Sequence, residues 1–153
     1  MVGGDASFSN SNFKDENGES QTSSTGIRIY PTIGYFFATK LAGGLNANFY
    51  YGNPSNATSN FGFGIGPFMR YYFFKPDKLI NIFIDGSYNF YNSKTSGNSF
   101  RDASNYRFKA GPVLYFNSSV GLECTLSYSS SKFDTYTSNE LSVNLGFQIH
   151  LEK

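Results

Sequence analysis

Seven charged residues and one histidine stand in segments where polar and apolar residues alternate, and they are the residues with the clearest chemical potential. They are Asp5, Arg28, Arg70, Asp85, Arg107, Lys109, Glu123 and His150. Such a set could form a network of salt bridges, line a gated path for ions, or carry acid–base or nucleophilic catalysis through the histidine. The choice depends on the elements that position these side chains.

The composition indicates one domain, 1–153, of an unusual kind. Aromatic residues make up 19% of the chain and charged residues only 15%, against about 25% charged in an ordinary soluble domain. The net charge of +1 and the lack of a Lys/Arg cluster argue against nucleic acid as a partner. Cys124 has no second cysteine to pair with, and no run of about 18 apolar residues could form a membrane-spanning helix.

Alternation with a period of two residues, as in "IRIYPTIGYFF", predicts β-strands. Eight strands are expected, at 2–12, 24–39, 41–52, 60–74, 79–93, 103–117, 119–131 and 138–151. The connections alternate between long ones, such as "FKDENGESQTSS", and short ones, such as "ATKL". This pattern favours an all-β fold: an eight-stranded antiparallel up-and-down transmembrane barrel with short periplasmic turns and longer extracellular loops.

The two faces of the strands differ sharply in polarity. One face is apolar and without charge, and it includes Ile33, Ile65, Ile82, Ile84, Leu122, Leu126 and Leu145, whereas the opposite face holds the charged set. Alternation alone also fits a soluble barrel with the apolar face inside. However, this face is too large and too aromatic for the interior of eight strands, and its aromatics gather near strand ends as two girdles. We therefore expect it to contact lipid.

Three prolines are difficult to place in such a barrel. Pro31, Pro67 and Pro112 fall inside strands that must pair on both edges, and proline has no N–H to donate. We expect a β-bulge at each.

The segments "PTIGYFFATKLAGGLNANFYYG", "GIGPFMRYYFF" and "AGPVLYFNSSVGLECTLSY" resemble the small outer-membrane β-barrel family of Gram-negative bacteria, the OmpA/OmpX type. The last strand, with Asn144, Gly146, Ile149 and Leu151, resembles the signal that barrel-assembly machinery reads, although such proteins usually end on an aromatic and this chain continues through Lys153. The resemblance implies the bacterial outer membrane and its lipid. The start "MVGGDASFSNSN" has no signal-peptide pattern, so we expect that a signal peptide has been removed.

In a narrow barrel, we expect the charged set to form a plug of paired side chains, because an isolated buried charge is very costly. The expected function is therefore non-enzymatic: a structural or interaction role through Ser-, Asn- and Thr-rich extracellular loops, which would contact a ligand or a larger membrane complex. A minor channel for ions or small solutes remains an alternative, as does a soluble lipocalin-like carrier of an apolar ligand.

Catalysis, a metal site and a cofactor are not expected. His150, the only histidine, falls near the short-turn end, whereas lipid substrates would reach an enzyme from the long-loop end. One histidine without a cysteine cluster does not make a metal site. The carboxylates of Asp15, Glu16, Glu19, Asp102, Asp134 and Glu140 are interpreted as solvated loop residues.

Overall fold

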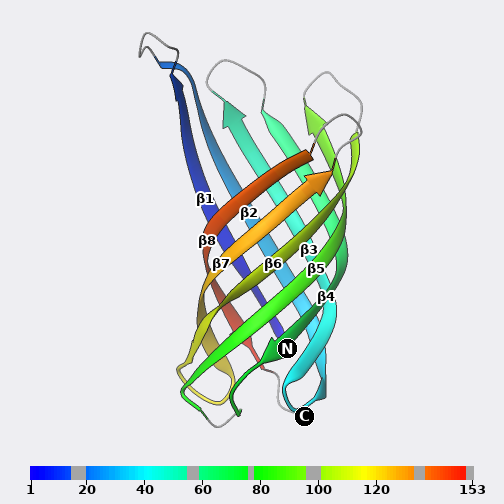
Figure 1. Ribbon diagram of the computed structural model, residues 1–153, viewed down its shortest axis with the longest axis vertical. Coiled ribbons are helices and arrows are strands. Elements are labelled where there is room, and N and C mark those ends of the chain that lie inside the picture. Colours follow the sequence, from blue (N-terminus) through cyan, green and yellow to red (C-terminus); the bar gives the residue numbers. More distant parts are fainter. Residues whose placement is uncertain (15–19, 55–58, 76–77, 96–100, 133–136, 151–153) are drawn as a thin grey trace.

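The computed structural model describes residues 1–14, 20–54, 59–75, 78–95, 101–132 and 137–150, and these form a closed antiparallel barrel (Figure 1). Its strands follow the sequence order: β1 (Val2–Lys14), β2 (Ser20–Ala38), β3 (Leu41–Pro54), β4 (Asn60–Tyr72), β5 (Ile80–Thr95), β6 (Arg101–Tyr115), β7 (Val120–Lys132) and β8 (Thr137–Ile149). The predicted fold class is confirmed. Over the described residues, no helix has the length and apolar character needed to cross a membrane.

Up-and-down order places alternate connections at opposite ends of the barrel. We name the two ends after the sequence prediction: the end with connections 39–40, 73–79 and 116–119 is the short-turn end, and the end with 15–19, 55–59, 96–100 and 133–136 is the loop end. The predicted alternation of long and short connections does not hold between the strands as they stand in the structure, where 73–79 is the longest connection. At the loop end, strands occupy part of what the sequence predicted as loop, since β2 begins at Ser20 and β5 continues to Thr95. Backbone pairing continues into these polar segments, as far as Lys14 with Ser20 and Ser93 with Arg101, because a ladder satisfies their N–H and C=O groups whatever the side chains.

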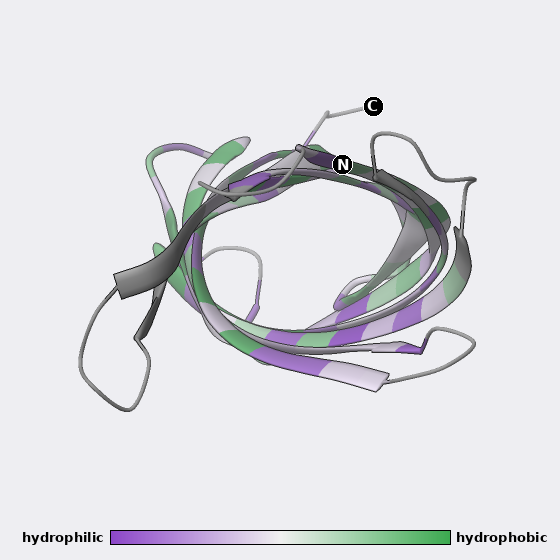
Figure 2. Cartoon of the chain, turned by 90° about the horizontal axis from the view of Figure 1, so that it is seen from above, coloured by the Kyte–Doolittle hydropathy of each residue, from purple (hydrophilic) through white to green (hydrophobic). Residues whose placement is uncertain are grey.

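The apolar face points outward and the polar face inward. The seven residues expected to meet lipid are between 42% exposed, at Ile82, and 63% exposed, at Ile33 and Leu145, whereas Glu123 is 1% exposed. Seen from above, hydrophilic and hydrophobic residues alternate along the strands in the barrel wall (Figure 2). A soluble carrier would need the reverse arrangement, with its apolar face around the lumen.

The prediction of bulges at the prolines is wrong. The β2–β3 ladder pairs Ile29 with Phe49 and Thr32 with Asn46, so the register is the same on both sides of Pro31. The ladders of β4 with β5 and of β6 with β7 skip Pro67 and Pro112 in the same manner. Omitting one pair at the proline costs the ladder only a local hydrogen bond. A bulge would instead insert one residue and turn the side chains that follow it to the wrong face of the sheet. The register shifts that do occur lie at strand ends, at Phe13/Lys14 and Phe36/Ala38.

Glycine precedes two of these prolines and allows the strands to approach closely. A Cβ on the inward-facing Gly66 would lie 1.8 Å from the carbonyl oxygen of Tyr88, and one on Gly111 would lie 2.1 Å from that of Cys124. At Gly66 and Gly111, the backbone of the neighbouring strand therefore occupies the space that a side chain would need.

The barrel closes by pairing its first strand with its last. In the described part of the chain, this ladder joins Val2–Ala6 to Leu145–Ile149, whereas β1 pairs with β2 over its whole length. The closing ladder lies toward the short-turn end, where β1 begins and β8 ends.

We predict that Ile84→Arg lowers the free energy of unfolding by about 2–4 kcal/mol, because it places a cation on the outward face of β5, at the depth of the hydrocarbon core. Leu79→Arg, at the short-turn end, is the matched control and should cost about 0–1 kcal/mol. Urea unfolding in lipid vesicles measures both values. Equal and small losses would contradict the outward apolar face.

We also predict that Gly66→Ala destabilises the barrel by about 1–3 kcal/mol, because its methyl group would collide with the backbone of β5. Gly86→Ala is the control, since a Cβ there would meet only two ring atoms of Phe108, at 3.4 and 3.5 Å, which is ordinary contact. The same unfolding measurement compares the two variants. If both are neutral, the close approach of β4 and β5 is not rigid.

Candidate functional site in the barrel interior

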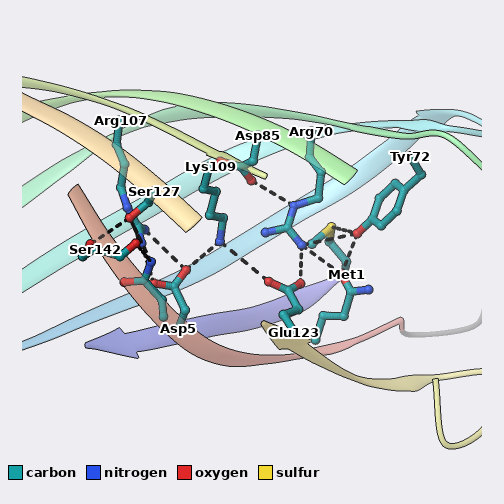
Figure 3. A network of polar contacts seen from close by, with 12 residues as sticks. Met1, Asp5, Arg70, Tyr72, Asp85, Arg107, Lys109, Glu123, Ser127 and Ser142 are labelled. Carbon is teal, nitrogen blue, oxygen red and sulfur yellow. Dashed lines mark hydrogen bonds and ion pairs between the residues drawn. The ribbon is translucent and has the colours of Figure 1, made fainter. Parts of the chain in front are cut away.

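Six buried charged side chains form one continuous chain of ion pairs across the lumen (Figure 3). In order, they are Arg107, Asp5, Lys109, Glu123, Arg70 and Asp85, with cations and anions alternating. We call this set the interior network. Its members come from β1, β4, β5, β6 and β7, so it joins opposite walls of the barrel.

Asp5 is the centre of one half of the network. Arg107 and Lys109 are two residues apart on β6, so both point inward and would repel each other. Asp5, from β1, lies between them: its Oδ1 is 2.8 Å from Nη2 of Arg107 and its Oδ2 is 2.6 Å from Nζ of Lys109. The same Nζ lies 3.7 Å from Oε2 of Glu123, which links the two halves.

Arg70 is the centre of the other half. Its Nε donates to Oδ2 of Asp85 at 2.9 Å, and its Nη1 donates to Oε1 of Glu123 at 2.5 Å. Nη1 also donates to Oε1 of Gln148 at 2.9 Å. Gln148 accepts a further hydrogen bond from the Tyr72 hydroxyl and donates one to the Tyr115 hydroxyl. The network therefore continues into a cluster of Tyr72, Phe83, Val113 and Tyr115 toward the short-turn end.

Aromatic rings cover the faces of the two guanidinium groups. The Arg70 carbon Cζ is 4.1 Å from the centre of the Phe83 ring, and that of Arg107 is 3.8 Å from the centre of the Tyr30 ring. Each guanidinium thus donates to at least one carboxylate and has an aromatic ring over its face, which is the arrangement that satisfies a buried arginine.

Two residues of the expected set do not join the network. Arg28 pairs instead with Glu140 toward the loop end and lies over the Tyr50 ring, 4.6 Å from its centre. The interpretation of Glu140 as a solvated loop residue is therefore wrong: β8 begins at Thr137, and Glu140 lies on its inward face with Ser142 and Asn144.

His150 lies near the short-turn end among aromatic rings. Its ring centre is 5.0 Å from that of Phe36 and 5.5 Å from that of Tyr115. Burial lowers the pKa of His150 to about 4, so the imidazole is neutral at pH 7. Its Nε2 has no hydrogen-bond partner in the described part of the chain. It therefore adds no charge to the interior network.

Several contributors were missed by sequence reasoning although their position in the strand places them inside. Tyr30 and Tyr72 lie two residues from Arg28 and Arg70, on the same face. Ser127, which accepts a hydrogen bond from Asn144 at 2.8 Å and contacts Ser142, is two residues from Thr125. The missing information was partner identity, because alternation says which side chains share the lumen and not which ones meet.

Chemically, the interior network is a closed set. Three cations face three anions, each charge has at least one opposite partner, and every member is at least nine-tenths buried. Over the described residues, no group of three or more His, Cys, Asp or Glu side chains is placed to hold a metal ion. This arrangement holds walls together and fills the lumen, and its charged groups are already engaged with one another.

No protein-family profile and no curated protein matches the sequence. Solved structures are similar in fold. Neisserial surface protein A aligns over 97% of this chain and 92% of its own, with a TM-score of 0.66 and 16% identity. The N-terminal barrel domain of Pseudomonas aeruginosa OprF aligns over 97% and 96%, with a TM-score of 0.58 and 14% identity. The outer membrane enzyme PagL aligns over 99% and 100%, with a TM-score of 0.51 and 12% identity. At these identities, the likeness establishes the fold: that of the small eight-stranded outer-membrane barrels.

We predict that Glu123→Gln lowers the free energy of unfolding by about 3 kcal/mol, because it leaves buried Arg70 and Lys109 with one anion fewer. Glu140→Gln is the matched control: it breaks a partly exposed pair, for which the loss should be below about 1 kcal/mol. Unfolding in lipid vesicles measures both, and a Lys109→Met/Glu123→Gln double variant should recover part of the loss. Equal, small effects would show that Glu123 is solvated.

Proposed function

We propose that this protein is a non-enzymatic β-barrel of the bacterial outer membrane, whose lumen is closed by the interior network and which acts through contacts made at its loop end. The observation that carries the proposal is the complete mutual pairing of six buried charges across the lumen. Charges engaged in this way fill and brace the barrel, so the contacts it makes with other molecules fall to its outer surface and its ends.

The membrane location is supported by the outer surface. Large apolar side chains are exposed on all eight strands, for example Phe8, Ile65, Phe108 and Leu145. A continuous apolar surface of this kind makes a protein associate in water and is stable in lipid. The outer membrane in particular is supported by the likeness to Neisserial surface protein A and the OprF barrel domain.

The non-enzymatic character is argued from the site, because PagL is an enzyme with the same fold. Catalysis on a lipid needs a nucleophile or base with a free reacting atom. Among the residues whose burial the structure describes, the buried carboxylates, Asp5, Asp85 and Glu123, are bound to cations. The Nε2 atom of the one histidine is unpaired, but its ring is packed among aromatic rings at the end opposite the loops, away from the side from which an outer-leaflet lipid would come.

The partners that fit this proposal are membrane lipid along the wall and the barrel-assembly machinery at β8 during insertion. At the loop end, where paired strands continue into Ser-, Asn- and Thr-rich segments, the partner would be an extracellular ligand or a larger membrane complex. Polar, uncharged residues of this kind suit hydrogen-bonded recognition.

Planar-bilayer recording tests the proposed closure of the lumen. The folded wild-type barrel should give no steady, uniform openings, because the ion pairs span the cross-section of a lumen that eight strands leave narrow. Insertion is checked on the same preparation by the slower gel migration of the heated sample relative to the unheated one. Regular openings of one size in the wild type, abolished by unfolding, would instead establish the minor channel.

A further inference from the structure

Three lysines surround one cleft at the short-turn end. Lys40 belongs to the connection of β2 with β3, and Lys75 and Lys78 belong to the connection of β4 with β5. Together with Phe73, Phe74 and Ile80, they line a cleft of about 610 Å³. The cleft lies apart from the interior network, which uses none of these residues.

Hydrogen bonds to backbone carbonyl groups hold the two connections in place. The N–H of Tyr72 donates to the carbonyl of Lys40 at 2.9 Å, and Nζ of Lys40 donates to the carbonyl of Phe73 at 2.8 Å. The N–H of Lys78 donates to the carbonyl of Lys75 at 3.2 Å, which keeps those two lysines close together. The cleft is therefore built before any ligand arrives, and Lys40 still has two ammonium protons to donate.

One side of the cleft is apolar and continues the lipid-facing surface. Phe73 is 45% exposed and Ile80 is 53% exposed, and Leu79 beside them is also exposed. Cationic and apolar groups thus share one cleft at the edge of the apolar wall. An anion attached to hydrocarbon chains satisfies both parts, whereas a free anion satisfies only the lysines.

Among the three connections of the short-turn end, lysine occurs only in the two that line this cleft. The third short connection, 116–119, has the sequence FNSS and no charge. There, Oδ1 of Asn117 accepts hydrogen bonds from the N–H groups of Ser119 and Val120, so the Asn117 side chain stabilises the turn. The sequences of the two connections that line the cleft, 39–40 and 73–79, contain three lysines and one acidic residue, Asp77.

We propose that this cleft binds an anionic phospholipid from the leaflet on the short-turn side, with the headgroup phosphate among Lys40, Lys75 and Lys78 and the acyl chains along Phe73 and Ile80. The proposal rests on the proposed membrane location. Lysines at the surface of a bilayer attract anionic lipid, and three of them around one site add their contributions.

Native mass spectrometry of the folded barrel in detergent micelles tests the site. The barrel is titrated with phosphatidylglycerol or with phosphatidylcholine of the same acyl chains. The wild type should retain phosphatidylglycerol more strongly by a factor on the order of ten. The variant Lys40→Gln/Lys75→Gln/Lys78→Gln should lose this preference. Lys132→Gln, which removes an exposed lysine at the loop end, should keep it.

The Lys75→Gln/Lys78→Gln variant preserves the Lys40 contact with Phe73, and it replaces the triple variant if that one does not fold. Equal retention of the two lipids by the wild type, or an undiminished preference in the lysine variants, overturns the site. Displacement of the lipid by inorganic phosphate at millimolar concentration would also overturn it, because the apolar side would then contribute nothing. Folding in phosphatidylcholine vesicles separates the two proposals: a barrel that folds there without discriminating refutes only this cleft, and a chain that folds in no lipid refutes both.

Discussion

The structure depends on one constraint: the backbone ladder closes on itself, so every residue of a strand is assigned either to the lumen or to the surroundings. In lipid, closure is required because unpaired N–H and C=O groups have no water to bind. Closure also leaves the lumen as the one place where the charged side chains of the membrane-spanning strands avoid contact with lipid. A shift of one residue in β6 would carry Arg107 and Lys109 to the outer face. The same constraint explains why the strand register is unchanged on the two sides of Pro31, Pro67 and Pro112.

Inside the lumen, the charges compensate for the limited ladder between the first and last strands. Asp5 lies within the paired segment of β1 and is bound to two cations of β6, while Gln148 lies within the paired segment of β8 and is bound to Arg70 of β4. The junction of β1 with β8 is therefore held by its own ladder and also by contacts across the lumen with β4 and β6. Buried ion pairs add little net stability compared with apolar packing, but losing one partner is expensive, so they favour this one closed arrangement over slipped ones.

Sequence alternation was sufficient for the architecture, because a period of two residues with no charge on one face leaves few folds available. It placed Ile84 and Leu122 outside and Glu123 inside, and the strand order followed from short connections. Alternation could not predict which inward side chains form ion pairs. Arg28 meets Glu140 because of the register of β2, β1 and β8, and the closure of the whole barrel sets that register. Sequence reasoning also mistook residues 20–23 and 101–102 for loops, because polar side chains say nothing about backbone pairing at the end of a hairpin.

The pairing of β1 with β8 sets an order of events on folding. These strands stand at opposite ends of the chain, so their contact has nearly the greatest sequence separation that the chain allows. Every other ladder joins consecutive strands through a short connection and can form locally, whereas this one must wait until all eight strands exist. Until then, a partly built sheet has two open edges, which aggregate in water and cannot be left bare in hydrocarbon. Ring closure and entry into the membrane are therefore coupled steps, and no subset of the strands is a stable stopping point.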